Sequence, residues 1–321
     1  MGAKSNKFEL MRFDARRSAV ESEKLLELLK MKGPQTGGEL LEATGMDALL
    51  LWRLCRQTPE IHSKCIGTRY VRIDRAVKGY ARLSPSIRRE FLTYTVLGVN
   101  GQCDTAEAKA DALHENIRSI SRAKLELARE SMEAVTQILP EWPEMADRVC
   151  FIIAGDIAYE MGHAVPRPEV STGRMVQGSD LDIIAIAENG VPKKMLKALD
   201  DAIMKKKYYL LMQPNYQEEL DYLVKDIARV REQLAFDTVP HMIAGKILHE
   251  SLFLHGSEDV FRKVKGLVSE YGVDSKLEEL KRRAEKDRQD AEHSLLDSVT
   301  PQSNSAVMHL FYTSEEGDEI Y

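Results

Sequence analysis

Two aspartates separated by one residue, Asp180 and Asp182, stand at the start of an apolar run. In a strand, alternation places both side chains on one face and turns Leu181 and Ile183 to the other. Neighbouring carboxylates repel one another unless a cation neutralises them. Oxygen-only ligands of this kind suit Mg²⁺ (or Mn²⁺), whose coordination is completed by water and substrate phosphates. The pair therefore predicts a divalent-metal site at which the phosphates of a substrate complete the coordination.

The residues around this pair extend the predicted site. Gly178 and Ser179, immediately before it, indicate a tight turn through which a triphosphate can approach backbone N–H groups. Asp221, in another apolar run, is the best candidate for a third carboxylate, and Glu219 is its rival. Three carboxylates can hold two metal ions, with Asp221 on the nucleophile side as metal ligand or proton acceptor. The simpler structural alternative is a strand end whose acidic side chains are merely solvated.

A family resemblance rests on three short motifs in chain order: Gly155-Asp156 after an apolar run, Gly173-Arg174, and Gly178-Ser179-Asp180-Leu181-Asp182. Together they resemble the polymerase-β-like nucleotidyltransferase superfamily, in particular the branch of PII-uridylyltransferases and minimal nucleotidyltransferases. The resemblance covers residues 148–260. It implies Mg²⁺-dependent transfer of a nucleoside monophosphate from an NTP to a hydroxyl acceptor, with release of pyrophosphate.

The resemblance also assigns roles to individual residues. Gly155 would begin the phosphate-binding turn, Arg174 would lie near the triphosphate, and Asp180 and Asp182 would bind metal. Acceptors in the superfamily include proteins, RNA and small molecules, and the sequence does not choose among them.

Two features depart from the family pattern. Residue 156 is Asp where the family has Gly or Ser, and a negative charge is unfavourable beside phosphates. The interval from Gly155 to Asp180 is longer than the family's, with residues 161–170 resembling an insertion. These departures keep an alternative open: a DNA-binding regulator or antitoxin-like module whose nucleotidyltransferase domain senses nucleotide without turning it over.

The spacing of apolar residues along the chain predicts the strands and helices that position the acidic residues. Continuous apolar runs predict buried strands and a charged amphipathic run predicts a helix between them. The expected strands are Arg148–Ala154, Leu181–Ala187, Tyr208–Met212 and Leu220–Val224, and the expected helix is Pro192–Lys205. Everything after Ile227 is expected to be helical.

The N-terminal third has the order of a winged helix-turn-helix domain, which it resembles. The predicted helices are Ser22–Lys32, Gly37–Ala43 and Ala48–Gln57, with Asp47 as a cap, and the predicted hairpin strands are Ile61–Ile66 and Arg69–Ile73. In such folds the third helix enters the major groove and the wing contacts the backbone.

The uneven distribution of charge along the chain supports a binding partner for this domain that differs from the partner of the rest of the chain. Residues 1–98 have a basic excess, whereas the remainder of the chain is acidic. Arg53, Arg56 and Arg69 are the candidate nucleic-acid contacts. The alternative is a small domain for protein contact or dimerisation.

The sequence thus predicts an α+β protein in five segments. They are a winged-helix-like domain at 1–80, a helical connector at 81–145 with a long helix at 105–138, a nucleotidyltransferase core at 146–226, a helical region at 227–297 and a polar tail at 298–321. The core is expected to be a mixed β-sheet flanked by helices.

Composition places the chain among ordinary cytoplasmic proteins. Its four cysteines (Cys55, Cys65, Cys103 and Cys150) lack paired spacing, which suits a reducing compartment. No apolar run approaches the roughly 20 residues that span a bilayer, so no membrane partner is expected. The N-terminus lacks the apolar core of a secretory signal.

A last basic and aromatic segment stands apart from these motifs. Lys205-Lys206-Lys207 is followed directly by Tyr208-Tyr209. The segment can contact nucleic acid or the triphosphate, or it can be a solvated helix end that the helix dipole favours.

Overall fold

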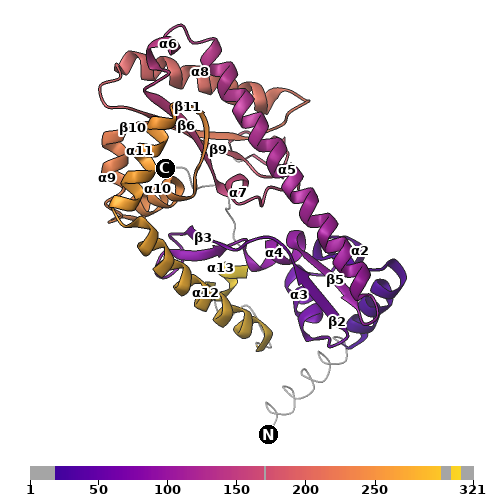
Figure 1. Ribbon diagram of the computed structural model, residues 1–321. Helices are drawn as coiled ribbons and strands as arrows, with labels where there is room; N and C mark the ends of the chain where they lie inside the picture. Colours follow the sequence, from indigo (N-terminus) through magenta and orange to yellow (C-terminus); the bar gives the residue numbers. More distant parts are fainter. Residues whose placement is uncertain (1–18, 170, 298–304, 312–321) are drawn as a thin grey trace. The chain divides into compact units, whose positions relative to one another are not determined.

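The computed structural model describes residues 19–169, 171–297 and 305–311 of the chain (Figure 1). The fold is α+β, as predicted. It contains two compact units, which cut across the predicted segment boundaries. Unit 1 comprises the described parts of Met1–Arg69, Ser84–Glu115 and Lys286–Thr313, and unit 2 comprises Tyr70–Leu83 and Asn116–Glu285. The predictions about the N-terminal signal and most of the polar tail fall outside the described residues.

Unit 1 contains short helices around a small sheet. After a helix over residues 19–32, its elements are β1 (Gln35–Thr36), α2 (Gly37–Thr44), α3 (Ala48–Gln57), β2 (Ile61–Cys65), α4 (Ile87–Tyr94) and β5 (Thr95–Val99). The three predicted N-terminal helices are therefore present. The Asp47 carboxylate accepts from the backbone N–H groups of Leu49 and Leu50, so the predicted cap of α3 is confirmed.

The predicted hairpin at residues 61–73 is wrong. β2 pairs antiparallel with β5, which also pairs with β1, in the strand order β1-β5-β2. β3 (Tyr70–Ile73) pairs instead with β4 (Ala81–Ser84) in unit 2. The reason is burial: all four residues of β3 are buried, and Val71 and Ile73 belong to the core of unit 2. A local turn signal does not reveal where a strand finds its hydrophobic partners.

Unit 2 is built on a four-stranded sheet with the order β10-β9-β6-β11. Its remaining elements are α5 (Cys103–Gln137), α6 (Trp142–Met145), β6 (Val149–Ala154), α7 (Gly155–Ala158), β7 (Arg167–Pro168), β8 (Met175–Val176), β9 (Leu181–Ala187), α8 (Lys193–Met212), β10 (Leu220–Asp226), α9 (Ile227–Gln233), α10 (Val239–Glu250), β11 (Leu252–Gly256), α11 (Glu258–Glu270) and α12 (Val273–Asp297). α5 and α12 begin in one unit and end in the other, and α13 (Ser305–Phe311) belongs to unit 1.

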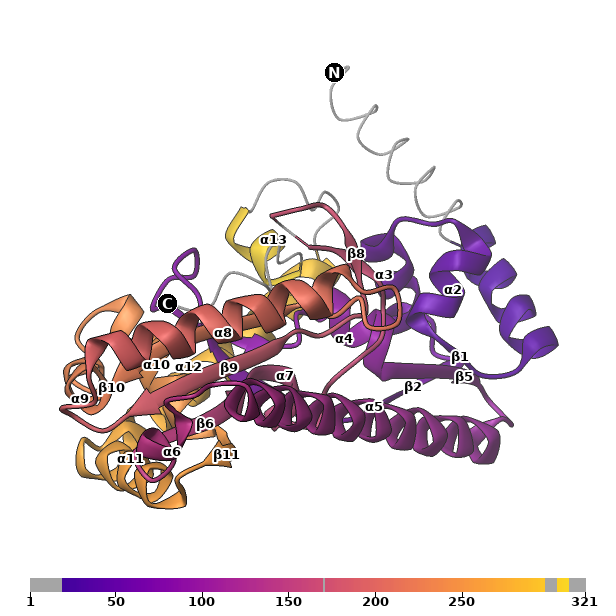
Figure 2. The same ribbon diagram turned by 90° about the horizontal axis from the view of Figure 1, so that it is seen from above.

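The sheet is buried on both faces, which explains its unbroken apolar strands. On one face, Phe151, Ile153 and Ile183 pack with α5 and α8. On the other, Ile152 and Ile184 pack with α9, α10 and α11 (Figures 1 and 2). The predicted strands are confirmed as β6, β9 and β10. Almost every residue of β6 and β9 is buried, whereas β10 lies at the edge of the sheet and most of its residues are half-buried.

Two predictions in unit 2 are wrong. Tyr208–Met212 is the end of α8, not a strand, because Leu199, Ile203 and Leu210 continue its buried face at helical spacing. The region after Ile227 is not wholly helical, because β11 pairs antiparallel with β6 at the edge of the sheet. The pairing partner of such a short strand lies about a hundred residues away in the sequence, where local period gives no information.

The four cysteines are free, as their spacing predicts. Within the described residues, no helix combines the length and the hydrophobicity needed to cross a membrane.

Removing the ring of Phe151 tests the packing of this sheet. Phe151 is fully buried, 5.9 Å from Trp142 and 6.0 Å from His255 between ring centroids. We expect Phe151→Ala to lower the free energy of unfolding by roughly 3–5 kcal/mol, because it leaves a cavity in the core. Urea unfolding in a Trp52→Phe background measures it, since Trp142 then remains as the only tryptophan. Leu252→Ala, at a partly exposed position of β11, is the control. A cost below about 1 kcal/mol for Phe151→Ala contradicts the packing described.

Candidate metal and phosphate site

The acidic residues meet because three strands are in register. Asp182 on β9 is opposite Asp221 on the parallel strand β10, and opposite Ala154 on the antiparallel strand β6. Residues paired in this way project from the same side of a sheet. A row of side chains therefore crosses the sheet, with two carboxylates adjacent and the small Ala154 beside them.

Three half-buried carboxylates form the cluster. Asp180, Asp182 and Asp221 offer one oxygen each, and these atoms lie within 4.8 Å of one another. Asp180 stands immediately before β9, two residues from Asp182. The structure thus brings together the three residues that the sequence predicts as metal ligands. The donor set, carboxylate oxygens only, fits a hard divalent cation such as Mg²⁺ or Mn²⁺.

The rival carboxylate Glu219 has another partner. Its Oε2 lies 2.7 Å from Nη1 of Arg167, and the same guanidinium lies 3.7 Å from Oδ2 of Asp180. Burial raises the pKa of Glu219 to about 7, against the opposing charge of Arg167. Asp221 pairs with Lys207, whose Nζ lies 2.6 Å from Oδ1. Two cationic side chains therefore contact the acidic group: Arg167 at Glu219 and Asp180, and Lys207 at Asp221.

Arg167 and Lys207 do not remove the repulsion among the carboxylates. Burial raises the pKa of Asp180; Arg167 opposes this rise, and the charges of Asp156 and Asp221 add to it. Burial, followed by the charges of Asp180 and Asp221, raises the pKa of Asp182 well above its usual range. The remaining negative potential at the cluster is what a divalent cation would neutralise.

Gly155 can lie against the Asp182 carboxylate because glycine has no side chain of its own. Its φ is +70°, and a Cβ added there would stand 2.2 Å from Oδ2 of Asp182. Its N–H donates to Oε1 of Glu250 at 3.1 Å. Glycine is thus required at the start of α7 by both conformation and space. Its predicted role in binding phosphate stays a prediction.

Asp156 organises the turn that precedes β9. Its carboxylate accepts from the hydroxyl of Tyr70 on β3 and from Oγ of Ser179 at 2.9 Å. Ser179 Oγ also accepts from the N–H of His163. Gly178 has φ +71°, and a Cβ there would stand 1.8 Å from the His163 carbonyl oxygen. The predicted tight turn at Gly178–Ser179 is confirmed, and Asp156 is the residue that ties it to α7.

Arg167, which the sequence does not single out, contacts the carboxylates, and its Nε also donates to the Gly178 carbonyl at 2.9 Å. Arg174 is exposed, and its carbonyl accepts from the N–H of Glu169 in the loop between β7 and β8. The predicted place of Arg174 near a triphosphate stays a prediction. Arg167 lies in segment 161–170, which resembles an insertion, and it belongs to none of the motifs. For this reason the sequence does not identify it as a site residue. Arg72 on β3 also lowers the pKa of Asp180 and Asp182, and no sequence signal links it to them.

The arginines predicted to bind nucleic acid are engaged within unit 1. Arg53 Nε donates to the Leu295 carbonyl at 2.6 Å, and Gln57 donates to a carbonyl in the same turn of α12. Arg56 lies 3.9 Å from Glu292. The last turns of α12 therefore cover the polar side of α3.

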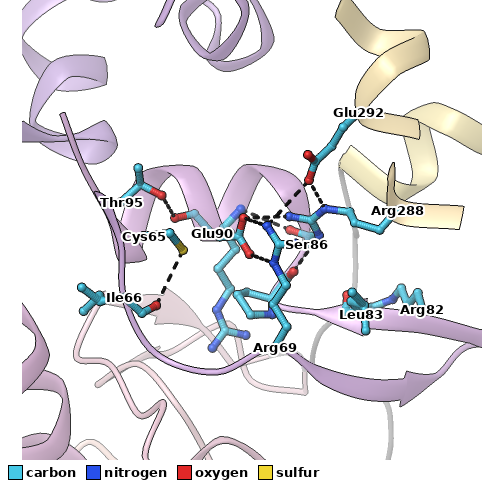
Figure 3. A network of polar contacts seen from close by, with 12 residues as sticks. Cys65, Ile66, Arg69, Arg82, Leu83, Ser86, Glu90, Thr95, Arg288 and Glu292 are labelled. Carbon is cyan, nitrogen blue, oxygen red and sulfur yellow. Dashed lines mark hydrogen bonds and ion pairs between the residues drawn. The ribbon is translucent and has the colours of Figure 1, made fainter. Parts of the chain in front are cut away.

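Arg69 takes part in a network of four charged residues, shown in Figure 3. Its Nε and Nη2 bind the two carboxylate oxygens of Glu90 at 2.6 and 2.7 Å. Arg288, which is buried, contacts Glu90 at 3.2 Å and Glu292 at 2.7 Å, and donates to the Pro85 carbonyl. Such paired, hydrogen-bonded charges hold α4 and the end of α12 together. A nucleic-acid role for the three arginines stays a prediction.

Comparisons with models of known protein families, with curated proteins and with solved structures found no match to this chain.

Substituting Gly155 tests the close approach of α7 to the cluster. We expect Gly155→Ala to displace the Asp182 carboxylate and to weaken Mn²⁺ binding by roughly 10- to 100-fold, as changes next to metal ligands do. Calorimetric titration with Mn²⁺ measures it. The control is Gly266→Ala, because an added Cβ there has no atom within 4 Å. Equal Mn²⁺ affinity in the two variants would show that the contact does not position Asp182.

Removing the Asp182 charge tests the repulsion within the cluster. A carboxyl whose folded-state pKa is raised binds protons more tightly than in the unfolded chain, so stability falls as pH rises from about 3.9 through the raised pKa. Asp182→Asn is uncharged throughout. We expect it to stabilise the metal-free protein at pH 8 by roughly 0.5–2 kcal/mol, and less at pH 5.

Urea unfolding in a chelating buffer at the two pH values measures this difference. Asp201→Asn, at an exposed position on α8, is the control. An equal gain at both pH values, or no gain at pH 8, would contradict the repulsion.

Proposed function

We propose that this protein is a Mg²⁺-dependent nucleotidyltransferase, which moves a nucleoside monophosphate from an NTP to a hydroxyl acceptor. The observation that carries the proposal is the meeting of Asp180, Asp182 and Asp221 on adjacent, in-register strands. The mixed sheet with helices on both faces and the glycine turns at Gly155 and Gly178 support the corresponding superfamily fold.

The side chains around the cluster suit a triphosphate. Asp180, Asp182 and Asp221 would hold the metal, which when bound would supply Lewis-acid activation and charge neutralisation. Arg167 and Lys207 already offset carboxylates at the site. With a cation on the carboxylates, these two side chains are the donors at hand for phosphate oxygens.

The proposed reaction is a displacement at the α-phosphorus. The oxygen of the acceptor hydroxyl forms a bond to phosphorus, and the bond from phosphorus to the bridging oxygen breaks. Pyrophosphate leaves with that electron pair. The hydroxyl proton passes to Asp221 or to solvent. Asp221 is on β10, and Gly155 follows β6 on the other side of β9, so the acceptor hydroxyl would approach from the β10 side.

For unit 1 we propose a winged helix-turn-helix fold with an extended wing. The order of helix, strand, two helices and two strands supports it, as does the sheet order β1-β5-β2. α3 has the place of the recognition helix, and the connection from β2 to β5 is longer than a short wing because it includes α4 and the residues 70–83 that belong to unit 2. Because α12 covers the polar side of α3, contact of α3 with nucleic acid would require the contacts of Arg53 and Gln57 with α12 to open.

A second candidate is a nucleotide sensor without turnover. Asp156 favours it, because its carboxylate occupies the turn after Gly155, where a negative charge opposes phosphate. The intact carboxylate cluster favours the enzyme.

Pyrophosphate release with each of the four NTPs, in Mg²⁺, tests the enzyme. Proteins and RNA from a cell extract serve as acceptors, with α-labelled nucleotide to mark the product. We expect Asp182→Asn to abolish release, by at least roughly 10³-fold, because it removes a metal-binding charge at the reacting centre. Asp201→Asn should retain full activity.

The outcomes separate the two candidates. Label on an acceptor, lost in Asp182→Asn, supports the enzyme. Mg²⁺-dependent binding of an NTP with no release of pyrophosphate, whatever acceptor is present, moves the assignment to the sensor. Absence of any NTP binding by the folded protein would overturn both.

A further inference from the structure

One side of α8 exposes large side chains that a solvent-facing helix does not require. Met204, Tyr208, Tyr209 and Met212 are each 40–57% exposed, although each is largely apolar. The spacing of Met204, Tyr208 and Met212 places them in one row along the helix. We call this set, with Lys205, the α8 surface. Figure 2 shows α8 along its length, next to the sheet.

Lysines directly precede these tyrosines in the sequence. Lys205 is exposed, and Lys206 Nζ lies 5.3 Å from the centre of the Tyr209 ring. Neither lysine belongs to an ion pair within the described residues, although the charge of Glu130 reaches Lys206. Tyr209 also lies 5.7 Å from Tyr216 between ring centres. The α8 surface therefore combines aromatic faces with positive charge.

The same turn of α8 leads to the carboxylate cluster. Lys207, adjacent in sequence to Tyr208, places its Nζ 2.6 Å from Oδ1 of Asp221. The next two residues, Tyr208 and Tyr209, are exposed, whereas Lys207 contacts Asp221 on β10. A polymer lying along the α8 surface would thus run toward the side of the site where Asp221 stands.

This combination fits one class of acceptor. Bases of a single strand stack on exposed aromatic rings, and its phosphates attract lysines that have no ion-pair partner. A duplex conceals the faces of its bases, and a small-molecule acceptor needs no such surface. We propose that the α8 surface binds single-stranded nucleic acid and presents its terminal hydroxyl to the carboxylate cluster. The assignment of that strand as acceptor rests on the proposed nucleotidyltransferase function.

Binding without catalysis tests the surface by itself. Fluorescence anisotropy with labelled 12-nucleotide oligoadenylate and oligouridylate RNA, in the absence of NTP, measures affinity at 50 and 200 mM salt. We expect Tyr208→Ala and Tyr209→Ala each to weaken binding about 5- to 100-fold, since each removes a stacking ring. Tyr208→Phe retains the ring and should bind as the parent does. Lys205→Ala should lower the slope of log affinity against log salt by about one.

Two matched controls guard against general effects. Tyr80→Ala removes a tyrosine that is 47% exposed elsewhere in unit 2, like Tyr209. Lys194→Ala removes an exposed lysine from the first turn of the same helix. Both should leave RNA affinity unchanged. Circular dichroism confirms that every variant is folded.

The outcomes distinguish this inference from the proposed function. RNA binding that depends on Tyr208 and Tyr209 supports the surface, and labelled RNA as product of the parent but not of Tyr208→Ala/Tyr209→Ala establishes the acceptor. Tyrosine-dependent binding without nucleotide transfer to the RNA retains the α8 surface as a binding site but overturns its role in presenting the acceptor, and pyrophosphate release then decides separately on the enzyme. No RNA binding, equal binding by the alanine variants, or transfer to a protein that survives both substitutions overturns the inference.

Discussion

The mutual repulsion of three carboxylates in a half-buried position is the constraint on which the rest of unit 2 depends. Asp180, Asp182 and Asp221 meet because β9 and β10 are parallel and in register, and burial raises the pKa of the first two. Arg167 and Lys207 offset part of the charge. The arrangement opposes folding unless the surrounding core compensates, as is typical of sites built for a cation or a reaction.

The core compensates by burying the sheet on both faces. Residues such as Phe151 and Ile152 alternate between two apolar layers, and the position of Asp182 opposite Ala154 distinguishes the observed register of β6 and β9 from a shifted one. A shift of one residue would turn Asp182 into the layer of α5 and α8. The close contact of Gly155 with Asp182, and the bonds of Asp156 to Tyr70 and Ser179, then fix the loops around the acidic row.

Much of this site could be predicted because its signals are local. The Asp-x-Asp pair, the glycine turn before it and the apolar strands depend on neighbouring residues, and Asp221 was recognisable from its own apolar flanks. Arg167 and Arg72 could not be recognised, because they lie on β7 and β3, short strands that are not part of the four-stranded sheet. The strand assignment of Tyr208–Met212 failed because two adjacent tyrosines favour a strand, whereas the buried face of α8 extends to Leu211.

Local sequence signals were enough to predict the α+β class, the three N-terminal helices of unit 1, the strands β6, β9 and β10, and the three aspartates that meet in the acidic cluster. All of these depend on hydrophobic period or on side chains a few residues apart. The sequence does not show that β2 pairs with β5, that β11 joins the sheet, that α12 covers α3, or which cations contact the carboxylates; these follow from tertiary contacts. These contacts join residues far apart in the chain, and packing and charge, not local propensity, select among the possible partners.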